Sequence, residues 1–181
     1  MARVLVPLAD GCEELEAVTI IDLLRRGGVE VVAAGLADAP VKASRGVVLL
    51  ADLPLDAVLA DDFDMIVLPG GAGGAERLSA DPRVQRLLKR LAESGKYTAA
   101  ICAAPKALAT AGLLAGRRAT SFPGWLDGIG GVTHSEEAVV TDGRVVTSRG
   151  PGTAMDFALH LLELLEGRGR RDEVEHALQR R

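Results

Sequence analysis

Cys102 is the residue in this chain whose type and setting most suggest chemistry. It follows the apolar run Thr98–Ile101 and precedes the small residues Ala103 and Ala104. A helical pattern then extends from Lys106 to Leu114. This order predicts a strand, a sharp turn and a helix with the thiol at the bend, as in a nucleophile elbow. Because a helix N-terminus stabilises a thiolate, we expect the Cys102 pKa to lie below the ~8.5 of a free thiol. A buried structural cysteine is the alternative.

A glycine-rich segment forms the second candidate feature. The apolar run Met65–Leu68 leads through Pro69 into Gly70, Gly71 and two further glycines before a helix. Glycines permit positive φ and a close backbone approach, so such a loop can present N–H groups to an anion. Many strand-to-helix loops are glycine-rich without binding anything, so this pattern alone is weak.

Acidic residues open a helix directly after the first expected strand. The helix dipole accounts for Glu13 and Glu14 in the first turn. Glu16 is different, because its neighbours Leu15, Val18 and Ile20 are expected to be buried. A buried carboxyl tends to remain protonated and can donate a hydrogen bond to a thiolate, so Glu16 is a candidate partner of Cys102.

These segments, in this order, resemble the ThiJ/PfpI superfamily, and specifically its Parkinsonism-associated deglycase branch with its bacterial YajL-like members. The resemblance covers almost the whole chain and rests on six motifs: Glu13–Val18, Asp22–Gly28, Ser44–Val47, Val67–Gly71, Ala99–Pro105 and Thr147–Thr153. It implies one domain over residues 1–181 with a flavodoxin-like, class I glutamine amidotransferase-like α/β sandwich.

The resemblance also implies roles for particular residues. Cys102 matches the reactive, oxidation-sensitive cysteine, and Glu16 matches the protonated glutamate beside it. The residues implied to form the oxyanion and substrate pocket are Gly70, Gly71, Ala103, Arg26 and Arg45. For the two arginines an ordinary surface ion pair is an equal alternative. A homodimer is implied as well, formed around Val18–Arg26 and Ser44–Val47.

The chain departs from this family pattern in its histidines. Some relatives carry a histidine after the strand that follows the nucleophile helix, a position that we align near Gly131. The histidines of this chain are His134, which we expect in a partly exposed strand, His160 in a late helix and His176 in the polar C-terminal segment. The residue after the cysteine is Ala103 rather than histidine, so a Cys-His-acid peptidase is disfavoured and a Cys–Glu pair is expected instead.

Length, charge and cysteine content restrict the possible functions. The 181 residues, 48% of them hydrophobic, can enclose a complete core. A net charge of −4 offers no electrostatic basis for binding nucleic acid or an anionic membrane. We expect no membrane span, no secretory leader and no metal site, and the two distant cysteines suggest no disulfide framework. A cytoplasmic location is therefore expected.

Apolar strands alternate with helical patterns along the chain, which predicts a mostly parallel sheet with helices on both faces. The expected strands are Val4–Leu8, Val29–Ala34, Met65–Leu68, Thr98–Ile101 and Val145–Ser148, with shorter ones at Val47–Ala51 and Ala138–Thr141. The expected helices are Glu14–Arg26, Val84–Ala92, Lys106–Leu114, Ala154–Leu165 and Asp172–Arg180. Ligands bind beyond the carboxyl ends of such strands, where Gly70 and Cys102 both lie.

Two functions fit these features. In the first, Cys102 attacks an aldehyde of a small dicarbonyl such as methylglyoxal, or of the adduct it forms on a protein, and Glu16 transfers the proton. This is a cofactor-independent glyoxalase or protein deglycase. In the second, oxidation of Cys102 makes the protein a stress sensor or redox-regulated chaperone, with Cys12 as a possible resolving thiol. We prefer to interpret Cys12 as an incidental small residue. An amidase or hydratase ranks below both functions.

Overall fold

A seven-stranded sheet forms the centre of the protein in the computed structural model, which describes residues 1–180. The strand order is β10-β11-β7-β6-β1-β2-β5. These strands are β1 (Arg3–Leu8), β2 (Glu30–Gly35), β5 (Leu53–Pro54), β6 (Met65–Leu68), β7 (Tyr97–Ile101), β10 (Val139–Asp142) and β11 (Val145–Ser148). All neighbours pair in parallel except β10 and β11. The predicted mostly parallel sheet is therefore confirmed.

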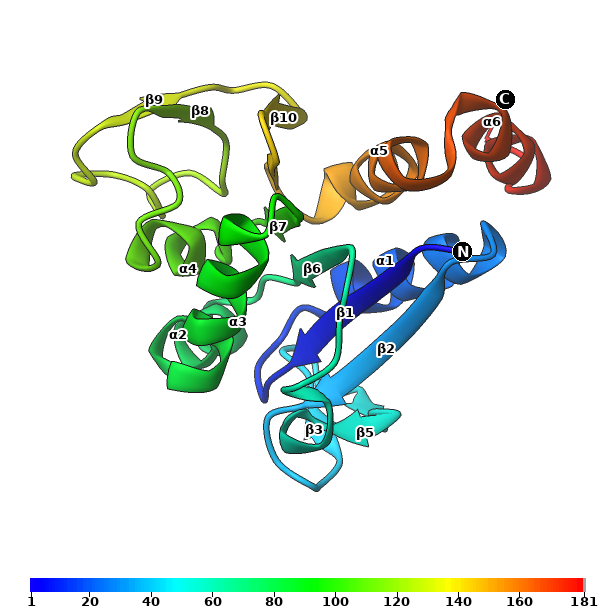
Figure 1. The fold of residues 1–181 in the computed structure, drawn as a ribbon, viewed down its shortest axis with the longest axis horizontal. Helices are drawn as coiled ribbons and strands as arrows, with labels where there is room; N and C mark the ends of the chain where they lie inside the picture. Colours follow the sequence, from blue (N-terminus) through cyan, green and yellow to red (C-terminus); the bar gives the residue numbers. More distant parts are fainter. Residues whose placement is uncertain (181) are drawn as a thin grey trace.

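Helices cover both faces of this sheet (Figure 1). On one side α1 (Glu14–Arg26) packs on α5 (Ala154–Glu166), which in turn packs on α6 (Arg168–Ala177). On the other side lie α2 (Ala72–Ala80), α3 (Pro82–Glu93) and α4 (Pro105–Thr110). Parallel strands buried on both faces need continuous apolar runs, and β6 is fully buried along its length.

The smaller elements complete the chain. Two-stranded sheets form from β3 (Val41–Lys42) with β4 (Val48–Leu49), and from β8 (Arg117–Ala119) with β9 (Val132–His134). Two 3₁₀ turns are η1 (Leu55–Val58) and η2 (Pro151–Thr153). No helix within residues 1–180 combines the length and apolar character that crossing a bilayer requires.

Several element boundaries differ from those expected. The glycine-rich loop is shorter than predicted, because Gly73 and Gly74 already belong to α2. Helix α4 ends at Thr110 rather than Leu114, where the cap Ala111 and Gly112 with φ of 80° end the helical path. Helix α6 begins four residues earlier than predicted, since Gly167 with φ of 85° separates it from α5.

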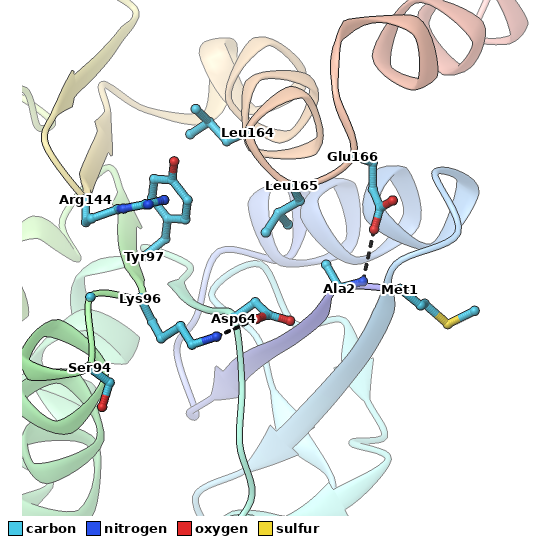
Figure 2. Close-up of a pocket in the computed structure, with 11 residues that line it drawn as sticks. Met1, Ala2, Asp64, Ser94, Lys96, Tyr97, Arg144, Leu164, Leu165 and Glu166 are labelled. Carbon is cyan, nitrogen blue, oxygen red and sulfur yellow. Dashed lines mark hydrogen bonds and ion pairs between the residues drawn. The ribbon is translucent and has the colours of Figure 1, made fainter.

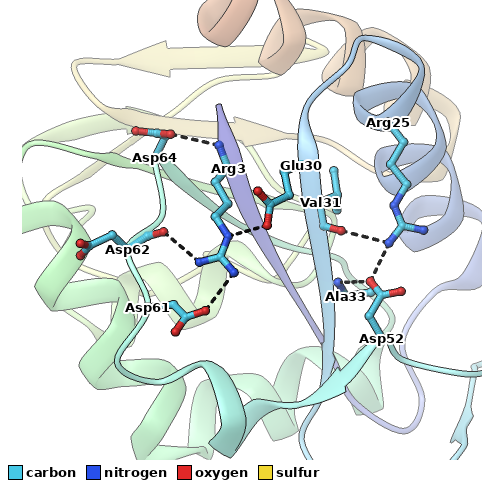
Figure 3. Close-up of polar contacts among 9 residues, drawn as sticks. All are labelled: Arg3, Arg25, Glu30, Val31, Ala33, Asp52, Asp61, Asp62 and Asp64. Atoms are coloured by element: carbon cyan, nitrogen blue, oxygen red, sulfur yellow. Dashed lines mark hydrogen bonds and ion pairs between the residues drawn. The ribbon is translucent and has the colours of Figure 1, made fainter. Parts of the chain in front are cut away.

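Arg3 ties together the segments at the amino end of the sheet (Figure 3). Its guanidinium contacts Glu30 at 2.7 Å and Asp61 at 2.9 Å, and it lies over the ring of Phe63. Its backbone N–H donates to Asp64 Oδ2 at 3.0 Å. Partly exposed ion pairs add little stability, so this cluster mainly fixes where β1, β2 and the segment before β6 begin.

A second contact in Figure 3 joins α1 to the far edge of the sheet. Asp52 accepts a hydrogen bond from Ala33 N at 2.8 Å and pairs with Arg25 at 2.6 Å. Arg25 also donates to Val31 O at 3.0 Å. The C-terminal end of α1 is thereby fixed against β2, which sets the position of the whole helix and of Glu16 in its first turn.

Gly27, at the end of α1, provides a test of how closely α1 packs on α5. A Cβ placed on Gly27 would overlap Cδ1 of Leu162, a fully buried residue of α5. We predict that Gly27→Ala lowers the free energy of unfolding by about 1–3 kcal/mol, because overpacking forces one helix to move. Urea denaturation measures this loss.

The matched control is Gly169→Ala in α6, where the new methyl group has open space around it. This change should be neutral or stabilising by up to ~1 kcal/mol, as expected for glycine replacement in a helix. Equal effects of the two substitutions would contradict the close packing of α1 on α5.

Candidate active site

Cys102 occupies a strained bend at the carboxyl end of β7. Its φ is 64°, a conformation that among non-glycine residues of the described chain only Gln179 shares. The bend is held by hydrogen bonds from Cys102 N to Ser148 O at 2.9 Å and from Phe122 N to Cys102 O at 2.8 Å. Its side chain keeps a small exposed surface, with the residue 8% accessible. Such strain is retained where neighbouring contacts fix it, and it often marks functional residues.

Glu16 projects from the first turn of α1 and is completely buried. Its Oε2 accepts a hydrogen bond from Gly70 N at 2.7 Å, while Oε1 has no hydrogen-bond partner within residues 1–180. Burial raises the pKa of Glu16 to about 7, although the Gly70 N–H and the Cys102 side chain both act to lower it. Near neutral pH this carboxyl can therefore accept or release a proton.

The burial of Glu16 was predicted on a partly wrong basis. Ile20 is buried as expected, but Leu15 and Val18 are about half exposed on the outer side of α1. Glu16 is enclosed by the glycine loop and Cys102 instead.

Gly70 and Gly71 allow the loop after β6 to approach both reactive groups. A Cβ on Gly70 would lie 2.6 Å from Cys102 Cβ and equally close to Glu16 Oε2. Gly71 has a φ of 84°, and a Cβ there would meet the backbone of Gly11 and Glu13. Any larger residue at these positions would therefore separate α1 from the cysteine.

The backbone donors are divided between the two reactive groups. Gly70 N–H is used by Glu16, so it is not available to an oxyanion, contrary to the implied pocket role. The N–H groups of Gly71 and Ala103 act on Cys102 instead, and both lower the pKa of its thiol. These two N–H groups are the ones placed to stabilise negative charge beside the sulfur.

The expectation of a depressed Cys102 pKa is wrong. Burial raises the pKa of the Cys102 thiol to about 12, and the negative charge of Glu16 is the next largest cause. The N–H groups of Gly71 and Ala103 only partly oppose this. A thiol beside an ionised, buried carboxyl keeps its proton. In the resting site Cys102 is therefore a thiol, and the Glu16 carboxylate beside it can receive the thiol proton.

Neither Arg26 nor Arg45 is as close to Cys102 and Glu16 as the glycine loop, and the two differ in position. Arg26 ends α1, ten residues or about 15 Å along the helix from Glu16, and pairs with Asp22 on the surface. Arg45 is closer, in a loop whose Ser44 hydroxyl donates to both Glu13 and Glu14. Its backbone N–H donates to Glu14 at 2.9 Å, which places it at the start of α1 near the site.

After α4, the segment around Phe122 lies beside Cys102, rather than the expected segment around Gly131. Gly131 accepts a hydrogen bond from Gly116 N at 2.7 Å, at the starting ends of the parallel strands β8 and β9. Phe122 follows the C-terminal end of β8, and its backbone N–H donates a hydrogen bond to Cys102 O. Its ring lies against Gly150, and 46% of the residue is exposed. No strand was expected at Arg117–Ala119, so nothing in the sequence indicated that Phe122, three residues later, lies beside Cys102.

The three histidines lie elsewhere. His134 is exposed in β9, as predicted. His160 is partly buried in α5 and lies 2.7 Å from the hydroxyl of Thr141, while His176 is exposed in α6. Within residues 1–180, no three His, Cys, Asp or Glu side chains form a group able to hold a metal ion.

Cys12 is fully buried, and burial is the main cause that raises its pKa to about 11. Its backbone packs against Gly74, where an added Cβ would lie 2.6 Å from Cys12 Cα. This setting agrees with a small packed residue rather than a reactive thiol.

Comparison with known proteins identifies the family. Residues 2–164 match the DJ-1/PfpI family. The protein dj-1beta of Drosophila melanogaster is 42% identical over 177 residues, covering 96% of this chain and 95% of its own length. The chain belongs to the DJ-1/PfpI family. The glutathione-independent glyoxalase DJR-1.2 of Caenorhabditis elegans is 40% identical over 92% of this chain and 89% of its own.

Some relatives in this family are much longer. The protein DJ-1 homolog B of Arabidopsis thaliana is 46% identical over 92% of this chain, which spans only 38% of that protein.

Solved structures agree with the fold. The crystal structure of Drosophila melanogaster DJ-1beta superposes with a TM-score of 0.96 at 41% identity, covering 98% of this chain and 97% of the other. Oxidized DJ-1 of Toxoplasma gondii has a TM-score of 0.93 at 40% identity, covering 99% and 98%. The flavodoxin-like α/β fold is thereby confirmed.

The raised pKa of Glu16 predicts a particular pH dependence of stability. The pKa is about 7 in the folded protein against a reference value of 4.5, so ionisation is harder in the folded state. The folded state thus loses stability as pH rises from about 4.5 to 7, by roughly 3 kcal/mol for this group. In Glu16→Gln this loss is absent, and urea denaturation at pH 5 and pH 8 should show a smaller difference than in the wild type.

Glu93→Gln is the matched control, because Glu93 is exposed at the end of α3. It should follow the wild-type pH dependence. A Glu16→Gln protein that loses as much stability as the wild type between the two pH values would show that Glu16 is already ionised at pH 5.

Proposed function

We propose that this protein is a cofactor-independent, cysteine-dependent glyoxalase acting on small dicarbonyls such as methylglyoxal. One observation carries the proposal: a fully buried carboxyl with a pKa of about 7 lies beside a thiol held at a strained bend. The membership in a family that includes a protein named as a glutathione-independent glyoxalase supports the same reaction class.

The first chemical step joins sulfur to the aldehyde carbon. Glu16 carboxylate takes the Sγ proton of Cys102 as the sulfur attacks, and the carbonyl electron pair becomes an oxyanion. Gly71 N–H and Ala103 N–H, which act on the sulfur in the resting site, are near enough to stabilise this charge. Return of the proton from Glu16 to the oxyanion gives a neutral hemithioacetal.

The remaining steps need only proton transfer and water. Glu16 carboxylate removes the proton from the former aldehyde carbon, and the electron pair moves towards the neighbouring ketone to form an enediolate. Protonation of the second carbon leaves a lactoyl thioester on Cys102. Hydrolysis by water releases lactate and restores the thiol. No oxidant or reductant is consumed, which fits a site built from one thiol and one carboxyl.

Adducts of dicarbonyls on proteins are a broader substrate class for the same chemistry. A hemithioacetal or aminocarbinol on a protein contains the same reacting carbon, so we include protein deglycase activity in the proposal. The narrow exposure of Cys102 favours free dicarbonyls over such adducts, because a side chain on a large partner must reach a thiol that is 8% accessible. We also propose, from the sequence alone, a cytoplasmic location and membership in the bacterial YajL-like branch.

Redox sensing through Cys102 is the second candidate function. The observation in its favour is the contrast in exposure, since Cys102 retains some accessible surface and Cys12 has none. Oxidation to a sulfinate adds negative oxygens next to Gly71 N–H and Ala103 N–H, which are suitable donors. The buried Cys12 is poorly placed to act as a resolving thiol.

A homodimer is a further proposal, supported by the apolar surface around the start of α1. Leu15 and Val18 on α1 are about half exposed, as are Val47 and Val48 in the hairpin that contacts it, and Leu50 just after the hairpin is mostly exposed. Exposed apolar patches of this kind commonly form interfaces. The patch overlaps the Ser44–Val47 loop, which was predicted to associate.

Cys102→Ala is predicted to abolish lactate formation from methylglyoxal without glutathione, because no bond to carbon can form. Glu16→Gln should lower kcat/KM by ~10²–10⁴-fold, the usual contribution of a general acid–base. The wild-type rate should rise with pH through about 7, as Glu16 ionises, and this rise should be lost in Glu16→Gln. Enzymatic detection of lactate measures all three.

Cys12→Ala and His134→Ala serve as controls and should retain near wild-type activity. A loss of ~10²-fold in His134→Ala would replace the Cys–Glu mechanism with a Cys–His one. If the wild type makes no lactate while peroxide adds two oxygens to Cys102 selectively by mass spectrometry, redox sensing is the better assignment. Turnover that survives Cys102→Ala would refute both functions.

The dimer proposal predicts twice the 18.9 kDa chain mass by light scattering at micromolar concentration. Val18→Lys should shift the protein to the monomer, since it places a charge inside the apolar patch. Ala80→Lys is the control, because Ala80 is exposed at the end of α2 in the opposite helix layer. A monomeric wild type, or equal effects of both lysines, would contradict an interface at α1.

A further inference from the structure

A cavity of about 560 Å³ lies at the end of the sheet opposite Cys102. It opens where β6 and β7 begin and where α5 ends (Figure 2). Cys102 follows the last residue of β7, so the length of β7 separates the cavity from the thiol. Five strand residues span about 16 Å. Its volume falls within the range of small-molecule sites, and the proposed glyoxalase reaction makes no use of it.

The cavity contains an arginine whose charge has no acidic partner. Arg144 lies over the ring of Tyr97 at 4.4 Å, and within residues 1–180 its guanidinium makes no hydrogen bond or ion pair. Its backbone carbonyl accepts a hydrogen bond from Thr98 N at 2.9 Å, which fixes the residue at the hairpin before β11. Stacking on an aromatic ring holds the planar guanidinium in place, so little further ordering is needed for it to bind a ligand.

The acidic residues around the cavity are already paired. Asp64 contacts Lys96 Nζ at 2.8 Å through one oxygen and Arg3 N at 3.0 Å through the other. Glu166 accepts from Ala2 N at 3.0 Å on the side away from Arg144, as Figure 2 shows. The groups near Arg144 that can still donate to a ligand are its guanidinium, the other N–H groups of Lys96, and the hydroxyls of Tyr97 and Ser94, which can also accept.

The rest of the wall is partly apolar, since Met1, Ala2, Leu164 and Leu165 line it together with Ser94 and Gly95. Both leucines come from the end of α5, and Figure 2 shows Leu164 near Tyr97 and Leu165 on the side towards Glu166. A planar fork of donors suits a carboxylate, which it can bind through two parallel hydrogen bonds. The adjoining leucines suit a short aliphatic group. We propose that this cavity is a second ligand site, which binds a small aliphatic carboxylate with its anionic end on Arg144.

The test uses isovalerate as the probe and isovaleramide as its neutral match, with binding followed by backbone amide NMR. We expect binding in about the millimolar range, with isovalerate shifting the amides of Lys96, Tyr97 and Arg144. Arg144→Gln should weaken this binding about tenfold or more, because it removes a charge-assisted pair. Arg86→Gln, at an exposed arginine of α3 outside the cavity, should leave the binding unchanged.

Four results would overturn the proposal. The first is shifts of Gly71 and Ala103 alone, which would place the carboxylate beside Cys102. The second is equal binding of isovaleramide, which would remove the need for a charge. The third is undiminished binding by Arg144→Gln, and the fourth is no binding by the wild type at tens of millimolar. Each of these two would show that the guanidinium binds no carboxylate. Because none of these readouts involves turnover, the result is independent of whether the protein is a glyoxalase.

Discussion

A carboxyl group without exposed surface lies beside a thiol at the carboxyl end of the central sheet, and both groups lose most of their hydration there. Two negative charges in such a place repel strongly, so the pair holds one negative charge far more easily than two. Much of the local structure follows from bringing these groups together. The loop after β6 can pass between them only because Gly70 lacks a Cβ, and its N–H then hydrogen-bonds Glu16.

The same pair explains why a helix N-terminus is a poor guide to the state of this cysteine. Helix α4 is only six residues long and begins three residues after Cys102, so its dipole is small and offset. The Gly71 and Ala103 N–H groups do favour negative charge on sulfur, but burial and the Glu16 carboxylate outweigh them. Of the two groups, Glu16 is therefore the better place for the single negative charge. Glu16, with a pKa of about 7, is therefore suited to exchange a proton with the thiol during a reaction rather than before it.

The fold was predictable from the sequence because its signals are local. Apolar runs such as Met65–Leu68 define buried strands, and the Asp142-Gly143 turn marks the hairpin between β10 and β11. Cys102, Glu16 and Gly71 were also predictable as neighbours, since they follow the carboxyl ends of the adjacent strands β7, β1 and β6. What failed depended on three-dimensional placement. How α1 packs decides that Leu15 faces outwards and that Arg26 lies far from the site. How the β8 segment packs decides that Phe122 contacts Cys102.

The strands β7 and β11 connect two regions of opposite electrostatic character. At their carboxyl ends, Cys102 N bonds Ser148 O and the local chemistry concerns a single proton held by a thiol and an acid. At their amino ends, Thr98 N bonds Arg144 O and the local feature is an unpaired cation on an aromatic ring. Because neighbouring parallel strands are joined by hydrogen bonds along their whole length, the backbone at both ends is rigid. A rigid sheet about 16 Å long separates the two regions, so a carboxylate bound on Arg144 does not overlap a substrate bound on Cys102. Distant sites without shared contacts act nearly independently, which allows each to be altered by mutation without disturbing the other.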